Sequence, residues 1–230
     1  MIRENLENVR FKISEAAKSA GNNPDDITLV AVTKTHGTSL INEAIESGVC
    51  DIGENKVQEV LEKYEDVKPV KWHLIGHLQT NKVKHIVDKV SLIHSVDSEK
   101  LLDEIEKQSK LKNIISNVLI QINISGEESK FGINPSETER LLEYCEHLEN
   151  VKIRGLMTIA PKFYEEFTSI KHFENIRRIY VDIQGKKYDN SSMEYLSMGM
   201  SQDYEEAIRA GSNMVRVGSA IFGKRDYEIK

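Results

Sequence analysis

Short apolar segments with strand character alternate with helical segments along almost the whole chain, and this alternation limits the possible folds more than any other feature. The first segment, Thr28–Thr33, is rich in β-branched residues and apolar nearly throughout, which is typical of a strand buried on both faces of a parallel sheet. Regular strand–helix alternation predicts right-handed crossovers and a parallel sheet. Seven further strand-like runs follow at Asp51–Glu54, Trp72–Gly76, Leu92–Val96, Asn117–Ile124, Lys152–Ile159, Tyr195–Met200 and Met214–Phe222. The helical stretches between the runs cover 39–47, 56–66, 79–89, 98–111, 135–148, 165–184 and 202–210.

The number of repeated units favours a closed barrel. Eight strand-like runs with a helix after each of the first seven predict an α/β fold of the (β/α)8 TIM type, and 230 residues is near the usual length for one. Apolar residues three to four positions apart from Ile2 to Ala20 add an extra N-terminal helix, which Gly21 ends. An open doubly wound sheet is the alternative, but the eight strands come in simple succession. We expect residues 1–230 to form a single domain.

Charge and composition exclude several other classes of protein. The formal net charge is −6, from 37 acidic and 31 basic residues, which makes a nucleic-acid partner a poor hypothesis. No apolar run reaches the roughly 18 residues of a transmembrane helix, and the first residues lack the apolar core of a secretory signal. Cys50 and Cys145 are too few to stabilise a secreted fold by disulfide bonds, and they lack the spacing of metal ligands. We therefore expect a cytoplasmic protein with no membrane association.

Lys34 directly follows the first strand-like run, where a barrel of this type places reactive residues. A lysine that closes a buried apolar strand must have its charge solvated or paired. One interpretation is a lysine that forms a Schiff base and is activated by its apolar setting. The other is a lysine that extends its ammonium group to solvent, and this segment alone favours the second interpretation.

The last two strand-like runs carry the features of a phosphate site. In barrels of this type the loops after strands 7 and 8 frequently bind phosphate. Ser201 stands at an expected N-cap, Gly218 allows close approach of the backbone, and Ser219 adds a second hydroxyl. Each residue alone is more simply explained as a helix cap or a turn. Their combination at both expected positions favours a bound phosphate.

Closure of the barrel would bring these two features together, because strand 8 would pair with strand 1 and its loop would lie beside Lys34. A lysine next to a phosphate site fits pyridoxal 5′-phosphate, and it also fits a Schiff-base aldolase acting on a sugar phosphate. Arg216 shares a strand face with Met214 and Gly218, so it can point into the barrel, where a pyridine nitrogen would be a partner. The alternative partner for Arg216 is a carboxylate inside the barrel, such as Glu54.

Two further polar residues occupy the second and third strand regions. Asn55 directly follows the second run, where its amide can meet a ring substituent, and His73 lies within the third run, where it can stack or hydrogen-bond. A lone inward histidine is more often a satisfied core residue than a catalyst. The seven histidines form no HxH pair, and their one HxxxH pair, His73 and His77, lies along a strand-like run rather than on a helix, so no metal site is predicted. Neither GxxxxGK[ST] nor GxGxxG occurs, so neither nucleotide-binding loop is predicted.

Together these segments resemble the pyridoxal phosphate homeostasis protein family, also called the YggS/PROSC family. The resemblance covers essentially the whole chain in order, and it is most specific at Trp72–Lys82 and Ser197–Ser201. It implies a barrel like the N-terminal domain of alanine racemase, in which Lys34 holds pyridoxal 5′-phosphate as an internal aldimine. The other residues that it implies are Ser201, Gly218 and Ser219 at the phosphate, Met200 nearby, and Arg216 facing the pyridine nitrogen.

The resemblance also implies a cytosolic protein that binds and supplies the cofactor and has no established reaction of its own. In the racemase a second acid/base comes from another domain, and this sequence ends soon after the eighth run, so we expect a cofactor face open to water. An arginine at the pyridine nitrogen leaves that nitrogen unprotonated, which weakens the electron sink of the cofactor. The alternative is a small enzyme, such as an amino-acid racemase or decarboxylase, with Tyr204 or His36 as the base.

Two expectations concern the surroundings of the site. Many family members have a proline shortly after the lysine, and here His36-Gly37 stands there, which predicts a more mobile loop. The expected partners are pyridoxal 5′-phosphate and the apo-enzymes that need it. No large exposed apolar stripe is evident, which favours a monomer.

Overall fold

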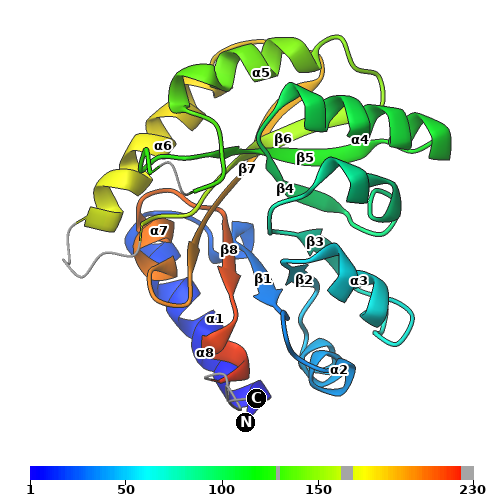
Figure 1. The fold of residues 1–230 in the computed structure, drawn as a ribbon. Coiled ribbons are helices and arrows are strands. Elements are labelled where there is room, and N and C mark those ends of the chain that lie inside the picture. The colour runs from blue at the N-terminus through cyan, green and yellow to red at the C-terminus, as the bar shows by residue number, and fades with distance from the viewer. Residues whose placement is uncertain (128–129, 162–167, 224–230) are drawn as a thin grey trace.

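The computed structural model describes residues 1–127, 130–161 and 168–223. Within those residues, parallel strands close into a barrel in the order β1 to β8, and β8 pairs with β1. Figure 1 shows these strands as an inner ring with the helices outside it. The predicted (β/α)8 barrel is therefore confirmed, and the open sheet is excluded.

The boundaries follow the expected runs closely. The strands are β1 (Thr28–Val32), β2 (Asp51–Glu54), β3 (Lys71–Leu74), β4 (Leu92–Val96), β5 (Ser116–Ile122), β6 (Val151–Thr158), β7 (Ser191–Met200) and β8 (Met214–Val217). The α-helices are α1 (Ile2–Ser19), α2 (Thr38–Glu46), α3 (Val57–Lys63), α4 (Glu99–Lys112), α5 (Thr138–Cys145), α6 (Thr168–Gln184), α7 (Tyr204–Arg209) and α8 (Ser219–Phe222). Short 3-10 helices lie at η1 (Pro24–Asp26), η2 (Thr80–His85) and η3 (Pro135–Glu137).

Two predicted elements differ from the structure. The run Met214–Phe222 was expected to be one strand, but the strand ends at Val217 and the chain turns at Gly218 into the short helix α8. The stretch 79–89 forms only the 3-10 helix η2, whose single buried residue, Val83, gives little packing to support a longer α-helix. The predicted helical residues 165–167 and the tail Lys224 to Lys230 lie outside the described residues.

The predicted N-terminal helix is confirmed as α1, which packs beside α7 and α8 at the outside of the barrel (Figure 1). Its buried face includes Ile2, Leu6, Val9 and Ile13, the positions that the helical period selects. The side-chain amide of Asn5 also donates to the carbonyl oxygen of Ile221 at 2.9 Å. The first helix therefore supports the segment that follows β8.

The interior of the barrel contains an apolar layer and polar side chains beyond it. Val30, Leu92, Leu119, Met157 and Met214 form one buried cluster, separate from the larger core between strands and helices. Interior side chains in layers are typical of this fold, so the barrel is a packed core rather than a pore. The buried polar residues of the interior include His73, His94, Ser197 and Arg216. No helix in the described part of the chain combines the length and apolarity that crossing a membrane requires.

Candidate functional site

Lys34 lies in the turn directly after β1 and is half-buried. The residues on either side of it are held by carboxylates from the next strand–helix unit. The Thr33 hydroxyl donates to Glu54 Oε1 at 2.7 Å, and the backbone N–H of Thr35 donates to Glu59 Oε2 at 2.7 Å. The backbone that carries Lys34 is therefore fixed on both sides.

Lys63 joins the two carboxylates from the last turn of α3. Its Nζ lies 2.8 Å from Glu54 Oε1 and 2.9 Å from Glu59 Oε2, and it donates to the carbonyl oxygen of Thr33 at 3.1 Å. We call Glu54, Glu59 and Lys63 the lysine-loop clamp. The sequence reasoning missed it, although Glu59 and Lys63 show the i, i+4 spacing of a helical ion pair.

Burial determines the electrostatics of this clamp. Burial raises the pKa of Glu54, and the opposing effects of Lys63 and Thr33 do not cancel the shift. For Glu59, burial acts to raise the pKa, but hydrogen bonds from the Thr35 N–H and from Lys63 outweigh it and lower the pKa overall. The second carboxylate oxygen of Glu54, Oε2, is buried and has no hydrogen-bond partner in the described part of the chain. Glu54 is thus a desolvated carboxylate whose charge is compensated by Lys63.

The backbone at Thr35 is strained. Its φ of +68° lies in the left-handed region, which a β-branched residue rarely adopts. Strain of this kind is kept only where the surrounding contacts fix it, and it is concentrated at functional sites. The bond from Thr35 to Glu59 supplies such a contact directly after Lys34.

The predicted phosphate residues come together at the start of α8. Ser201 Oγ accepts from the backbone N–H of Gly218 at 3.1 Å and from that of Ala220 at 3.5 Å. The expectation that Ser201 caps the following helix is wrong, because α7 begins at Tyr204 with Asp203 as its N-cap. The Met200 N–H donates to the carboxylate of Asp203 at 2.6 Å, which turns the chain before that helix.

The β8 loop lies against the end of β1, as barrel closure predicts. A Cβ at Gly218 would lie 3.3 Å from both the Cβ and the carbonyl oxygen of Val32, two residues before Lys34. Ser219, at the first position of α8, is exposed. Gly199 has a φ of +90°, and a Cβ there would lie 2.6 Å from that of Ala207, so glycine is required for α7 to pack this closely on β7.

Arg216 points into the barrel and is almost fully buried. Its guanidinium donates to Ser197 Oγ at 2.6 Å and to the carbonyl oxygen of Thr158 at 2.8 Å. Burial lowers its pKa to about 10, against the opposing effect of Asp203, so the side chain is still cationic at neutral pH. The alternative of an ion pair with Glu54 is wrong, since in the described residues Glu54 pairs with Lys63.

The structure separates the two remaining predicted residues. Asn55 is half-buried directly after β2, and its carbonyl oxygen would lie only 2.2 Å from a Cβ at Gly76, so β3 approaches it closely. His73 instead has both ring nitrogens occupied inside the barrel, at 2.9 Å from Asp51 Oδ1 and 2.9 Å from His94 Nε2. Asn55 thus lies near the carboxyl end of the strands, whereas His73 reaches the opposite end.

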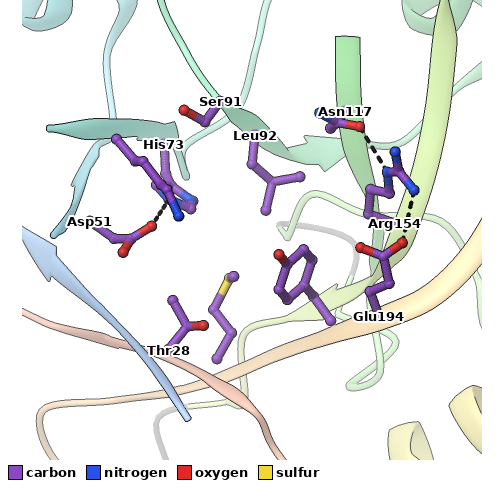
Figure 2. A pocket seen from close by; sticks show the side chains of 11 residues that line it. Thr28, Asp51, His73, Ser91, Leu92, Asn117, Arg154 and Glu194 are labelled. Carbon is purple, nitrogen blue, oxygen red and sulfur yellow. Dashed lines mark hydrogen bonds and ion pairs between the residues drawn. The ribbon is translucent and has the colours of Figure 1, made fainter. Parts of the chain in front are cut away.

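That opposite end contains a cavity of about 320 Å³ lined by the beginnings of the strands. Figure 2 shows charged side chains on two sides of it, with Asp51 directed toward His73 and Arg154 lying between Asn117 and Glu194. Arg154 donates to Asn117 at 2.8 Å and to Glu194 at 2.8 Å. The cavity and Lys34 are therefore at different mouths of the barrel.

The two residues named as bases for the enzyme alternative, Tyr204 and His36, lie in different surroundings. Tyr204 is buried in the core, and burial together with Glu205 raises its pKa to about 12. The His36 ring stacks on Phe222 with centroids 4.6 Å apart, which joins the loop after β1 to α8. In the described residues no three His, Cys, Asp or Glu side chains gather as a metal-binding set.

The fold and the site define a (β/α)8 barrel with a lysine at the end of β1, beside a helix start that carries serine and glycine after β8. Residues 5–226 match the family described as the alanine racemase N-terminal domain. The chain is 42% identical over 226 residues to the pyridoxal phosphate homeostasis protein of Aquifex aeolicus, covering 97% of this chain and 98% of that protein. It is also 42% identical over 235 residues to the protein of the same name from Escherichia coli K12, covering 100% and 99%.

Solved structures agree with this assignment. PipY of Synechococcus elongatus, solved with pyridoxal phosphate bound, has a TM-score of 0.83 at 30% identity and covers 97% of this chain and 100% of that one. An alanine racemase of Clostridium difficile has a TM-score of 0.75 at 15% identity over 99% of this chain and 57% of its own, which shows the common fold alone. The chain belongs to the alanine racemase N-terminal domain family and, within it, to the pyridoxal phosphate homeostasis proteins.

Proposed function

We propose that this protein binds pyridoxal 5′-phosphate through Lys34 and buffers it or supplies it to enzymes that need it. The observation that carries the proposal is the contact between Gly218 and Val32, since it brings the serine-bearing start of α8 beside the strand end that presents Lys34. The names of the relatives and the cofactor in the PipY structure support the same assignment. We propose residues 1–230 as a single cofactor-binding domain.

The residues around α8 fit a phosphate group. The backbone N–H groups of Gly218 and Ala220 both donate to Ser201 Oγ, so a phosphate would accept from them at the place of that hydroxyl, and Ser219 is exposed at the helix start. Convergent N–H groups and hydroxyls are the common means of holding a phosphate. A side chain at Gly218 would fill the space beside Val32. We therefore assign Ser201, Gly218 and Ser219 to the phosphate, with Met200 next to them.

The remaining residues fit the ring and the aldehyde. Lys34 would hold the aldehyde of the cofactor through its Nζ, and the clamp holds the backbone on both sides of the lysine. Arg216 would face the pyridine nitrogen, and Asn55 would meet a ring substituent. His73 belongs to a different role, because its two ring nitrogens are occupied by Asp51 and His94. We assign it to the support of Arg216 rather than to contact with the cofactor.

Binding without turnover is the function that these surroundings favour. Bound pyridoxal phosphate supplies an electron sink, which is strongest when its ring nitrogen is protonated. Arg216 remains a cation at neutral pH and donates hydrogen bonds, so it leaves that nitrogen unprotonated. Tyr204 is buried with a pKa of about 12, which makes it a poor base for an amino-acid racemase or decarboxylase.

The first experiment is the visible absorption spectrum of the purified protein before and after borohydride, followed by mass mapping of the reduced peptides. We expect a visible band that borohydride removes and a pyridoxyl group on Lys34. The variant Lys34→Ala should lose both signals. The matched variant Lys56→Ala, which removes an exposed lysine after β2, should keep them. Absence of a band after addition of pyridoxal phosphate would overturn the assignment and favour an aldolase-like site.

A second experiment separates a carrier from an enzyme. The loaded protein is incubated with an apo-enzyme that requires pyridoxal phosphate, and the recovery of activity is followed together with the loss of the visible band. We expect transfer, and we expect no change in the configuration or carboxyl group of added amino acids. Turnover of an amino acid that Lys34→Ala abolishes would instead establish the enzyme alternative.

The cellular setting follows from the same function. We propose a cytoplasmic location, because pyridoxal phosphate enzymes of metabolism act there and the two cysteines, Cys50 and Cys145, are free thiols. We propose apo-enzymes as partners and a monomer as the active form. Sedimentation of the loaded protein alone and with an apo-enzyme tests both statements, and a stable dimer would contradict the second.

A further inference from the structure

A chain of hydrogen bonds runs through the barrel from the amino-terminal cavity to Arg216. Asp51 Oδ1 lies 2.9 Å from His73 Nε2, and His73 Nδ1 lies 2.9 Å from His94 Nε2. His94 Nδ1 lies 3.1 Å from Ser197 Oγ, which accepts from Arg216 at 2.6 Å. Because β4 and β7 are not neighbours in the barrel, the bond from His94 to Ser197 crosses its interior.

The members of this chain are shielded from water along most of its length. His94 and Ser197 have no exposed surface, and His73 and Arg216 are each 3% exposed. Only Asp51 is more accessible, at the cavity that Figure 2 shows. Burial, together with the neighbouring His73 and the guanidinium of Arg216, holds the pKa of His94 well below its usual range, so His94 is neutral. A neutral imidazole donates from one nitrogen and accepts at the other.

When His73 carries a single proton, the two ends fix the direction in which every bond donates. A guanidinium has no acceptor, so Arg216 donates to Ser197, and a carboxylate has no donor, so Asp51 accepts from His73 Nε2. The Ser197 O–H then donates to His94 Nδ1, which leaves His94 Nε2–H to donate to His73 Nδ1. All four bonds therefore point from Arg216 to Asp51, and both imidazoles carry their proton on Nε2.

We propose that Asp51, His73, His94 and Ser197 form a directed relay that positions Arg216 for the pyridine nitrogen, with Asp51 as its distant anchor. The role of this relay rests on the proposed function, because bound pyridoxal phosphate would supply the ring that Arg216 faces. Asp51 and His73 are positioning residues, because they act on Arg216 through His94 and Ser197 and do not touch the cofactor. A chain of donors with one direction is mutually polarised, so each bond strengthens the next.

The first test measures the histidine tautomers in the whole protein by two-dimensional ¹⁵N–¹H NMR, before and after addition of pyridoxal phosphate. We expect both His73 and His94 to be neutral with the proton on Nε2. A proton on Nδ1 of His94, or a doubly protonated His73, would reverse the donors and overturn the relay. This measurement needs no bound cofactor, so it stands even if the protein fails to bind pyridoxal phosphate and the proposed function is wrong.

The second test removes the anchor. Asp51→Ala should release His73 into a mixture of tautomers and weaken pyridoxal phosphate binding by about three- to tenfold, the usual weight of one buried hydrogen bond. Asp51→Asn should keep the tautomer and the affinity, because its amide oxygen can still accept from His73 Nε2. Glu194→Gln is the matched control, since Glu194 lines the same cavity and pairs with Arg154 outside the relay.

The pattern of these results decides the proposal. Loss of affinity in Asp51→Ala with rescue in Asp51→Asn and no change in Glu194→Gln supports the relay. Equal losses of affinity in Asp51→Ala and Glu194→Gln would show that any change in the lining of the cavity weakens binding. Unchanged affinity in Asp51→Ala with a disturbed His73 tautomer would show that Arg216 does not depend on the relay. Either of the last two results overturns it.

Discussion

Two ion pairs of the same length occupy the two mouths of the barrel, and they differ in burial. At the carboxyl end Lys63 Nζ lies 2.8 Å from Glu54, with the two side chains 11% and 0% exposed. At the amino end Arg154 lies 2.8 Å from Glu194, with side chains 33% and 46% exposed. Removing one partner of a buried pair leaves an uncompensated charge, whereas water replaces a lost partner at the surface. The same distance therefore implies very different contributions to stability.

Breaking the buried pair should have the largest effect. Lys63→Met leaves the carboxylate of Glu54 buried without a cation, so we expect the free energy of unfolding to fall by about 3–5 kcal/mol. Urea denaturation followed by circular dichroism measures this loss. The matched control is Lys68→Met, which breaks the exposed pair with Glu46 and should cost far less. Equal losses in the two variants would contradict the comparison.

The buried pair should also give Lys63→Met a distinctive pH dependence. The pKa of Glu54 is already raised by burial, and loss of Lys63 raises it further. A carboxyl group whose pKa is higher in the folded state contributes stability below its unfolded pKa and loses that contribution as pH rises through the folded pKa. The variant should therefore be closest to wild type at acidic pH, below the unfolded pKa of the carboxyl group, and lose stability relative to wild type as the pH rises. A loss independent of pH would show that Glu54 is not the group affected.

Breaking the hydrogen-bond chain between the two mouths should lower the free energy of unfolding by an intermediate amount. Ser197→Ala leaves a guanidinium N–H of Arg216 and the Nδ1 of His94 without their partner, at a cost of about 2 kcal/mol. Ser192→Ala on the same strand removes a hydroxyl that bonds the exposed Glu194, and it should cost less than about 0.5 kcal/mol. Thermal and urea unfolding of the two variants give the difference. Similar costs would mean that the buried hydroxyl is not needed there.

Relieving the strained turn beside Lys34 should stabilise the protein slightly. A left-handed residue costs about 1–2 kcal/mol, and glycine loses about 0.5–1 kcal/mol in backbone entropy, so Thr35→Gly should gain a fraction of 1 kcal/mol. Asn113→Gly is the control, because Asn113 has a φ of +53° at the end of α4 and asparagine tolerates this region. A clear loss in Thr35→Gly would show that the threonine side chain makes a contribution of its own.

The exposed pair should give the smallest effect. Glu194→Gln is expected to change the free energy of unfolding by less than about 0.5 kcal/mol, and the change should vanish in high salt. Urea denaturation at low and high salt measures it. A loss above about 1 kcal/mol that salt does not reduce would mean that Arg154 and Glu194 act as a buried pair.

The sequence alone predicted the barrel and much of the carboxyl-end site. Hydrophobic periodicity is a local property, so it marked every strand of the barrel, and the end of the first run fixed the place of Lys34. The residues around Gly218 were predicted from the two loops that barrels of this type use. The site roles of Lys34, Asn55, Met200, Ser201, Arg216, Gly218 and Ser219 stay predictions until a cofactor complex tests them. His73 was predicted in this group from its place in the third run, and in the structure its two ring nitrogens bond Asp51 and His94.

Only the tertiary structure decided how the charged and polar groups are satisfied. Lys63 meets Glu54 from the following helix, and Ser201 caps α8 rather than its own helix, which no local pattern indicates. His94 was visible only as a polar residue inside the apolar run Leu92–Val96. Its partner Ser197 is 103 residues away, on the far side of the closed barrel. The alternation of apolar residues determines which strands form, but closure determines which buried polar groups meet, because each must find its partner in a space that water does not enter.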